Sequence, residues 1–360
     1  MRRRPTLTAS PTARTPPRRT GPLARAVVSL LLACACVAII AACGSKQDAL
    51  SAPGAKPFTV MLDWFPNADH AALYTAIHDG YFKSVGLDVR PLVPGETAEP
   101  LKLLAAGKVD MAISYEPQLL LARDQGLKLV SIGALVQRPL TSIIALPQAH
   151  VRSVGDLAGK RVGTAGIAYQ AVELHTALAA AGVNPSTVQE ANVGFNLVPA
   201  MLSGKVAATL GGFWNYEAMQ LEQLHKHPVV IPVDKAGVPT YNELVLVVRE
   251  DEAGSRGQDL RAFLQALTHG EQKARENPQT AASLIVAANP SAQLKLQVTS
   301  LEKTLAATLP AEHSKPYGWQ NPNAWAVFGR WMLAHGLIRS NPNTAALPPF
   351  TNEFLPGEGI

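Results

Sequence analysis

Cysteine is almost absent from this sequence. Its 360 residues include three cysteines, Cys34, Cys36 and Cys43, and none follows position 43. Beyond that position the chain therefore has no thiol nucleophile, thiolate metal site, iron–sulfur cluster or disulfide. The remaining chain of about 300 residues must be stabilised by its hydrophobic core alone, and a chain of that length can bury a sufficient one.

Charge is also sparse. Only 16% of the residues are charged and 47% are hydrophobic, which excludes a wholly disordered chain. The first 43 residues contain seven of the 32 basic residues and no acidic one, so the rest of the chain has 25 basic and 27 acidic residues, a formal net charge of −2. Because Lys and Arg do not cluster in that part, we expect no nucleic-acid partner.

The arginine-rich start is followed by an uncharged apolar run, residues 26–42. A basic stretch, an apolar core and small residues, in that order, are typical of a secretory signal. The end of the run, Ile40–Gly44 (IAACG), resembles a bacterial lipobox in which Cys43 would carry the lipid. We therefore predict a lipoprotein signal peptide over 1–43, a linker over 44–56, and an exported protein held by lipid at the cell membrane, facing the periplasm or exterior. The alternative is a retained membrane anchor.

From Lys56 onward, apolar runs alternate with segments of helical periodicity. The strands predicted in this way are 58–62, 87–93, 109–114, 127–135, 141–146, 161–164, 206–210, 229–233 and 243–249. The predicted helices are 71–82, 98–106, 119–123, 170–181, 198–203, 216–224, 259–276, 279–287, 292–309 and 324–335. This alternation indicates an α/β fold with parallel or mixed sheets flanked by helices. We predict lobe 1 over 57–144, lobe 2 over 145–242, and a return to lobe 1 with C-terminal helices over 243–360.

Aromatic rings and carboxyl groups recur at three predicted strand ends: Asp63–His70 (DWFPNADH), Ser114–Gln118 (SYEPQ) and Gly211–Glu217 (GGFWNYE). Ligands of open α/β sheets collect beyond the carboxyl ends of strands. Flat apolar faces beside amide and carboxylate groups suit a planar, hydrogen-bonding heterocycle. The alternative is that these rings are ordinary core residues and that the polar side chains, Asp69 among them, cap helices.

Motifs for other chemistries are missing or weak. HExxH, GxSxG, GxGxxG and GxxxxGK[ST] do not occur. Gly163–Gly166 precedes a predicted helix and offers backbone N–H groups to an acceptor, which makes Gly166 a candidate binding residue. The tripeptide His225–His227 (HKH) is more typical of an exposed loop than of a metal site. We expect no metal and no cofactor.

Several segments together carry a family resemblance. They are LDWFPNADHAALYTA (Leu62–Ala76), DGYF (Asp79–Phe82), GLDV (Gly86–Val89), AAGKVDMAISYEP (Ala105–Pro117), DLAGKRVG (Asp156–Gly163) and GGFWNYE (Gly211–Glu217). Between residues 58 and 249 the chain resembles the thiamine-pyrimidine (NMT1/THI5-like) branch of the bacterial solute-binding proteins. The resemblance implies a two-lobed periplasmic-binding-protein fold of the second type. It also implies a monomer that binds an aminopyrimidine precursor of thiamine, formylaminopyrimidine or hydroxymethylpyrimidine, and delivers it to an ABC permease and its ATPase subunits.

Such a ligand has an aromatic face, ring-nitrogen acceptors and an exocyclic amine donor. The expected walls are Trp64, Tyr115 and Trp214, and the expected polar partners are Asp63, Asn67, Glu116 and Glu217. A further set of candidates comprises His70, Gly166, Tyr169, Tyr216 and Tyr241. The anionic ligands of related binding proteins (taurine, nitrate and alkanesulfonates) would require Arg or Lys where the strand ends carry acidic residues.

Two alternatives stay open. One is a larger planar ligand such as riboflavin, since aromatic walls serve either ring system. The other is an enzyme, because the fungal thiamine pyrimidine synthases share the resemblance. Those enzymes carry a lysine at the position of Ser114, a reactive histidine at that of Gln118, and cysteines near 243–249, and this chain has none of these. The retained loop and the changed reactive positions favour binding without catalysis.

Overall fold

The computed structural model describes residues 54–96, 99–342 and 347–358. The predicted signal peptide (1–43) lies outside the described residues, as does all of the predicted linker except its last three residues. The last of these, Lys56, begins the first strand rather than ending the linker. Within these described ranges, no helix is long and apolar enough to cross a membrane.

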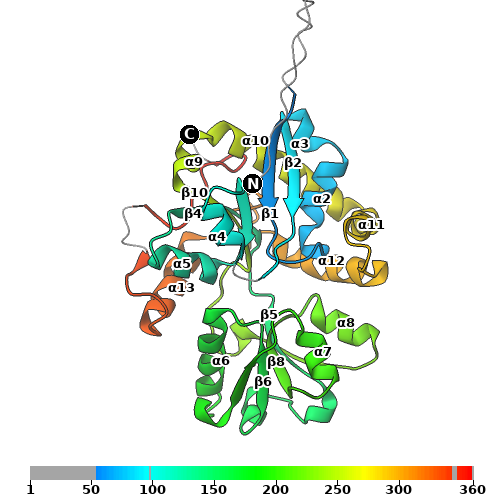
Figure 1. Cartoon of the computed structure of the whole chain (residues 1–360), viewed down its shortest axis with the longest axis vertical. Helices are drawn as coiled ribbons and strands as arrows, with labels where there is room; N and C mark the ends of the chain where they lie inside the picture. The colour runs from blue at the N-terminus through cyan, green and yellow to red at the C-terminus, as the bar shows by residue number, and fades with distance from the viewer. Residues whose placement is uncertain (1–53, 97–98, 343–346, 359–360) are drawn as a thin grey trace, which may run out of the picture. The chain divides into compact units, whose positions relative to one another are not determined.

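Residues 55–360 are built on two five-stranded sheets, with strand orders β2-β1-β3-β10-β4 and β7-β6-β8-β5-β9 (Figure 1). The first sheet comprises β1 (Lys56–Met61), β2 (Leu87–Leu92), β3 (Met111–Ser114), β4 (Leu129–Val136) and β10 (Leu244–Arg249). The second comprises β5 (Thr141–Ala145), β6 (Arg161–Thr164), β7 (Gln189–Asn192), β8 (Ala208–Phe213) and β9 (Val229–Pro232). Each sheet with its helices is called a lobe below, lobe 1 for the first sheet and lobe 2 for the second.

The chain passes between the sheets twice. Residues 137–140 join β4 to β5, and residues 233–243 join β9 to β10. The first crossing comes before residue 141 and not at the expected boundary after residue 144, because β5 pairs with β8 and β9 and so belongs to the second sheet. The expected boundary between residues 242 and 243 lies within the second crossing. The buried run of β5 fits either sheet equally well, so its apolar pattern does not identify the sheet that it joins.

The strand that follows each crossing runs antiparallel to its neighbours: β5 against β8 and β9, and β10 against β3 and β4. β5 and β10 each begin at the edge of their sheet that faces the other lobe and run away from that lobe. β3 and β8 run antiparallel to them and therefore end at this facing edge. So do β1 and β6, which are parallel to β3 and β8. Four strand ends are thus directed toward one another, which is where α/β sheets bind ligands.

The helices connect and cover these strands. Those before the second crossing are α2 (Ala71–His78), α3 (Tyr81–Ser84), α4 (Glu99–Ala105), α5 (Glu116–Asp124), α6 (Ala168–Ala180), α7 (Leu197–Leu202) and α8 (Glu217–Gln223). Those after it are α9 (Glu250–Ser255), α10 (Gly257–Glu276), α11 (Pro278–Ala288), α12 (Leu294–Thr308) and α13 (Pro322–Ala334), and short 3-10 turns such as η1 (Ala68–His70) lie between elements.

One predicted helix is divided in the structure, and strand β7 and helix α9 were not predicted. The helix expected over 71–82 is two helices, because Gly80 between them has φ +75°, a left-handed conformation that ends the first helix. Strand β7 was not predicted, because its sequence QEAN has no apolar alternation. It lies at the edge of its sheet and pairs only with β6, so it needs no buried face.

Lobe 1 packs helices on both faces of its sheet. Phe58 and Val60 of β1 share a core with α2, α3 and α10, whereas Met61 belongs to a second core with α4, α5 and α13. Alternate residues of a strand point to opposite faces, so both faces of β1 are buried, as expected of a sheet covered on two sides. The C-terminal helices thus complete the lobe that the N-terminal strands begin.

The crossing of α10 and α2 leaves no room for a side chain at Gly270. A Cβ atom there would overlap the carbonyl oxygen of Ala72 and lie 2.7 Å from Cβ of Ala76. We predict that Gly270→Ala lowers the free energy of unfolding by about 2–3 kcal/mol, because α10 must move away from α2. Urea unfolding followed by circular dichroism measures this.

Gly254→Ala is the matched control, since Gly254 lies in α9 with no atom within 4 Å of a Cβ placed there. Its higher helix propensity is expected to leave the stability unchanged or to raise it by up to about 1 kcal/mol. Equal effects of the two substitutions would contradict the packing described here.

Candidate functional site

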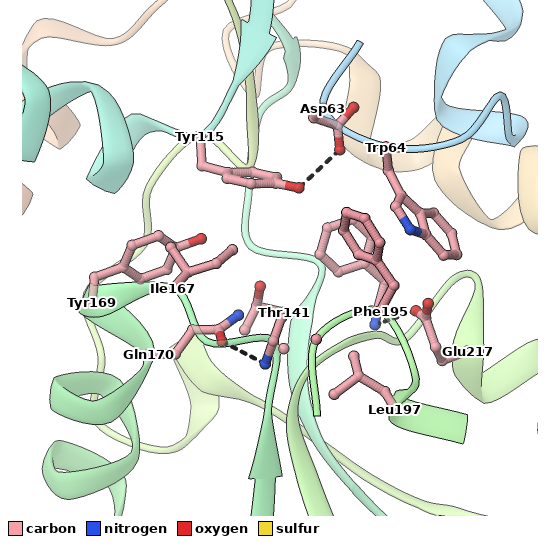
Figure 2. A pocket seen from close by; sticks show the side chains of 14 residues that line it. Asp63, Trp64, Tyr115, Thr141, Ile167, Tyr169, Gln170, Phe195, Leu197 and Glu217 are labelled. Atoms are coloured by element: carbon pink, nitrogen blue, oxygen red, sulfur yellow. Dashed lines mark hydrogen bonds between the residues drawn. The ribbon is translucent and has the colours of Figure 1, made fainter. Parts of the chain in front are cut away.

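A pocket lies between the segments that follow β1, β3, β6, β7 and β8 (Figure 2). Its empty volume, counted together with the space open to solvent, is about 510 Å³. Lobe 1 contributes Asp63, Trp64 and Tyr115 to its lining. Lobe 2 contributes Thr141, Ala165, Ile167, Tyr169, Gln170, Gly194, Phe195, Leu197, Gly211, Phe213 and Glu217.

The loop after β1 is held by its own side chains. Asn67 begins η1, and its Oδ1 accepts a hydrogen bond from the Asp69 N–H at 2.8 Å. Asn67, and not Asp69, is therefore the capping residue. The Asn67 N–H in turn donates to Nδ1 of His70 at 3.2 Å. Because Nδ1 is an acceptor here, Nε2 carries the proton of the neutral imidazole.

The Nε2 proton of His70 holds the carboxyl group of Asp63 in place through a hydrogen bond. His70 Nε2 lies 2.8 Å from Oδ1 of Asp63, and the Tyr115 hydroxyl donates to Oδ2 at 2.9 Å. Burial raises the pKa of Tyr115 well above its usual value, with a further contribution from the Asp63 charge, so this hydroxyl keeps its proton. Both oxygens of Asp63 are held, and the carboxyl group is fixed at the pocket wall. His70 supports Asp63 from behind and does not line the pocket.

Aromatic rings from both lobes form the sides of the pocket (Figure 2). The Trp64 ring contacts the edge of Tyr216 at 5.4 Å between centroids and lies 6.1 Å from Phe195. The rings of Tyr115 and Tyr169 meet on the other side at 6.5 Å. Trp64 Nε1 is buried and has no hydrogen-bond partner among the described residues. The walls thus offer flat apolar faces and one uncommitted N–H donor.

Glu217 supplies the second carboxyl group of the lining. Its Oε2 accepts from the Phe213 N–H at 2.7 Å. Burial raises its pKa to about 7, and the nearby Asp69 charge adds to the shift, so both protonation states are populated near neutral pH. None of the lining residues in the described part of the chain is basic. The pocket is therefore suited to a neutral or cationic ligand that donates hydrogen bonds.

Glycine at position 211 allows close packing in the floor of the pocket. Gly211 has φ +108°, and a Cβ there would lie 2.5 Å from Nε2 of Gln170. Gln170 also accepts a hydrogen bond from the Ala165 N–H at 2.9 Å. The absence of a side chain at Gly211 lets Gln170 join the ends of β6 and β8.

Glu116 does not line the pocket. It is fully buried, and its Oε2 accepts from the backbone N–H and the Nδ2 of Asn242 at 2.8 and 2.7 Å. The carboxyl group therefore ties the start of α5 to the second crossing segment. Burial raises its pKa to about 8.

Other expected site residues also lie outside the lining. Trp214 donates from Nε1 to the carbonyl oxygen of Pro139 at 3.0 Å and so holds the first crossing segment. Tyr216 accepts from Gln297 of α12 at 3.1 Å, and Tyr241 is buried with its ring 4.8 Å from Phe328. Asn67 and Gly166 are likewise absent from the lining. Of the expected residues, the structure brings together Asp63, Trp64, Tyr115, Tyr169 and Glu217.

Comparison with known proteins places the chain in a family. Residues 67–281 match the family described as NMT1/THI5 like. A formylaminopyrimidine-binding protein of Halalkalibacterium halodurans is 34% identical over 316 residues, which cover 86% of this chain and 93% of that protein. The chain belongs to the NMT1/THI5-like family. The resemblance carried by the motifs is confirmed.

The NMT1/THI5-like family also includes enzymes. A 4-amino-5-hydroxymethyl-2-methylpyrimidine phosphate synthase of Legionella pneumophila is 25% identical, covering 83% of this chain and 92% of that protein. Among solved structures, the periplasmic aliphatic sulphonate binding protein of Escherichia coli has a TM-score of 0.64 at 14% identity, covering 79% of this chain and 94% of that one. The expected two-lobed periplasmic-binding-protein fold is confirmed.

In this member of the family, Asp69 joins the lobes outside the pocket. Its Oδ1 accepts from Nδ2 of Asn215 at 2.7 Å and from the hydroxyl of Thr304 at 3.1 Å. Asn215 belongs to the loop after β8, whereas Asp69 and Thr304 belong to η1 and α12 of lobe 1. Burial raises the pKa of Asp69 to about 6. Asp69 is thus part of the contact between lobes.

Three of the lining residues that sequence reasoning missed, Gly194, Phe195 and Leu197, follow β7. Phe195 follows Gly194 and precedes Asn196, an aromatic residue beside an amide at a strand end, as in the other three loops. This pairing of an aromatic residue with an amide is visible in the sequence. Because β7 was not predicted, residues 193–196 were not placed at a strand end.

The raised pKa of Glu116 predicts a change of stability with pH. Between its usual value of 4.5 and about 8, the folded protein keeps a proton that the unfolded chain releases, so stability falls as the pH rises through this window. In Glu116→Gln, Oε1 still accepts from Asn242 but no proton is exchanged.

We predict that the melting temperature of the wild type, relative to that of Glu116→Gln, falls by about 2 °C or more between pH 5 and pH 8. Differential scanning fluorimetry at both pH values measures it. Glu353→Gln, at an exposed position, is the control and keeps the wild-type profile. If the melting temperature of Glu116→Gln changed with pH as much as that of the wild type, the raised pKa of Glu116 would be contradicted.

Proposed function

We propose that this protein is the solute-binding component of an ABC importer for an aminopyrimidine precursor of thiamine, formylaminopyrimidine or hydroxymethylpyrimidine. The observation that carries the proposal is the pocket itself, with two carboxyl groups set between aromatic rings from both lobes and no basic lining residue. The formylaminopyrimidine-binding relative of H. halodurans supports it. Permease and ATPase subunits are the proposed partners, and the binding protein is proposed to act as a monomer.

The chemistry of a 4-aminopyrimidine matches the groups in the pocket. Its exocyclic amine is a donor for Asp63, whose oxygens are held in place by His70 and Tyr115. Its ring nitrogens are acceptors for Trp64 Nε1 or for the protonated form of Glu217. Each well-stacked aromatic contact adds about 0.5–1.5 kcal/mol beyond its buried area. A small neutral ring can thus be bound without a charged anchor.

One other ligand class fits less well. A sulfonate or nitrate would meet Asp63 and Glu217 with no cation in the lining, so its charge would be repelled. Riboflavin has the aromatic faces that the walls require and stays the alternative planar ligand, which calorimetry distinguishes from a pyrimidine.

An enzymatic role is the second candidate, since the Legionella relative is a synthase. Here the Ser114 hydroxyl donates to Gln118 Oε1 at 3.1 Å, so the positions that resemble the reactive lysine and histidine of the fungal enzymes hold a neutral hydrogen bond. β10, near which those enzymes carry cysteines, is the apolar sequence LVLVVR. Neither position holds a base or a nucleophile of ordinary reactivity. We therefore propose binding without catalysis.

Ligand binding between two lobes requires that they open and close. The two crossing segments, residues 137–140 and 233–243, are the proposed hinge. A ligand that contacts Asp63 and Trp64 of lobe 1 together with Glu217 of lobe 2 makes its full set of contacts only when the lobes are closed. It therefore stabilises the closed form by these differential contacts.

We predict that isothermal titration calorimetry of residues 44–360 detects binding of formylaminopyrimidine or 4-amino-5-hydroxymethyl-2-methylpyrimidine, and none of taurine or riboflavin. Glu217→Gln should weaken pyrimidine binding about tenfold or more, because Gln cannot alternate between donor and acceptor at one oxygen. Glu222→Gln, on the exposed side of the same helix, is the matched control with wild-type affinity.

Absence of heat and of any thermal shift with both pyrimidines would overturn the proposed function. Formation of 4-amino-5-hydroxymethyl-2-methylpyrimidine phosphate by the purified protein alone would support the synthase. Tight riboflavin binding would identify the ligand as a larger heterocycle.

Export and a lipid on Cys43 are proposed from the order of basic, apolar and small residues in 1–43. We predict that the mature chain expressed in a bacterium fractionates with membranes and begins at a diacylglyceryl-modified Cys43 by mass spectrometry. Cys43→Ala should abolish the modification. A wild-type chain that stays in the membrane with residues 26–42 uncleaved and no lipid on Cys43 would instead identify that run as a retained anchor.

A further inference from the structure

The solvent exposure of the aromatic walls varies across the pocket. The pair on one side, Tyr115 and Tyr169, is buried, with 8% and 1% of each residue exposed. On the other side Phe65 is 45% exposed, and Trp64 and Phe195 are half-buried. Phe65 does not itself line the pocket but contacts Phe195, which does. The more exposed rings thus lie at the side of Phe65 and Phe195, which we call the mouth of the pocket.

The mouth is covered by rings from opposite lobes. Phe65, from the loop after β1 of lobe 1, lies with its ring centroid 5.9 Å from that of Phe195, from the loop after β7 of lobe 2, at an interplanar angle of 67°. Trp64 lies 6.1 Å from the same Phe195 ring. Both distances are those of edge-to-face aromatic contacts. Figure 2 shows Phe195 beside Trp64, at the Glu217 side of the pocket.

The loop that carries Phe195 is anchored in lobe 2 at both of its ends. The Val193 N–H donates to the carbonyl oxygen of Thr164 at 2.9 Å, and the side chains of Val193 and Leu197 are buried in one core cluster of lobe 2. Between these anchors, Phe195 places its ring against lobe 1. When the lobes separate, this ring must leave Trp64 and Phe65, because its backbone moves with lobe 2.

We propose that Phe195 is the gate of the pocket: its ring closes the mouth against Trp64 and Phe65 and sets the rate at which a bound ligand leaves. The ligand-release part of this inference rests on the proposed function, whereas the ring contact stands on the geometry alone. A gate of this kind acts after closure, so its loss speeds dissociation and has little effect on association.

The experiment compares Phe195→Ala, Phe195→Leu and Phe65→Ala in residues 44–360. Stopped-flow displacement of 4-amino-5-hydroxymethyl-2-methylpyrimidine and of formylaminopyrimidine measures the dissociation rate. We expect Phe195→Ala to raise it about 3- to 10-fold, as the loss of one aromatic contact predicts, with association changed less than about twofold. Phe195→Leu, which keeps apolar volume but not the ring, falls between. The double variant with Phe65→Ala is no faster than Phe195→Ala, since Phe195→Ala has already removed the contact between Phe65 and Phe195.

Leu224→Ala, at an equally exposed apolar residue of lobe 2, is the control and releases ligand at the wild-type rate. A second measurement needs no ligand: hydrogen exchange of the amides of residues 193–196. Phe65→Ala lies in the other lobe, so faster exchange there reports loss of the ring contact. If the wild type binds neither pyrimidine, the proposed function fails while this measurement still decides the contact. Unchanged exchange in Phe65→Ala, or an affinity loss in Phe195→Ala that comes from slower association, overturns the gate.

Discussion

One buried carboxyl group joins the two crossing segments, and the geometry of the pocket depends on it. Glu243, at the end of the second crossing, accepts hydrogen bonds from the backbone N–H groups of Leu140 and Thr141 at 2.6 and 2.8 Å, and from the Thr141 hydroxyl at 3.1 Å. Thr141 begins β5 and lines the pocket, and the residue after Glu243 begins β10. β5 and β10, the two strands that run antiparallel to their neighbours, thus begin at one joint, which Glu243 forms with Leu140 and Thr141. Burial raises the pKa of Glu243 to about 7, so this joint lies in an interior of low polarity.

Acidic side chains surround the pocket, and each has its own function in the structure. Asp63 is fixed by His70 and Tyr115 and faces the ligand space, whereas Asp69 joins lobe 1 to the loop after β8. Glu217 is held by a single backbone donor at the pocket wall. Desolvation by burial is the first cause of the raised pKa in Asp69, Glu217 and Glu243. The site therefore disfavours anions and is suited to ligands with N–H donors and flat faces.

The same backbone arrangement serves different ligands in its structural relatives. The E. coli protein with a TM-score of 0.64 is a binding protein for aliphatic sulphonates, yet it shares only 14% of residues with this chain. Fold alone therefore does not decide the ligand. In such a fold the ligand is selected by the loops beyond the inward-facing strand ends, here those of β1, β3, β6, β7 and β8, because the two lobes direct these loops toward a common space whatever their sequence.

The sequence by itself determined the α/β class, most strands and helices, and the strand ends that carry aromatic and acidic residues, because these depend on local periodicity and on residue type. The sequence did not show that Glu217 lines the pocket and that Glu116 does not. Both begin a helix after a strand, but Glu116 is bound by Asn242, 126 residues away in the chain, and Glu217 by Phe213, four residues away. Local sequence does not show which distant N–H group donates a hydrogen bond to a carboxyl group. The tertiary structure decided that, and it decided the mouth of the pocket, since Phe65 and Phe195 meet only because the two lobes bring their loops together.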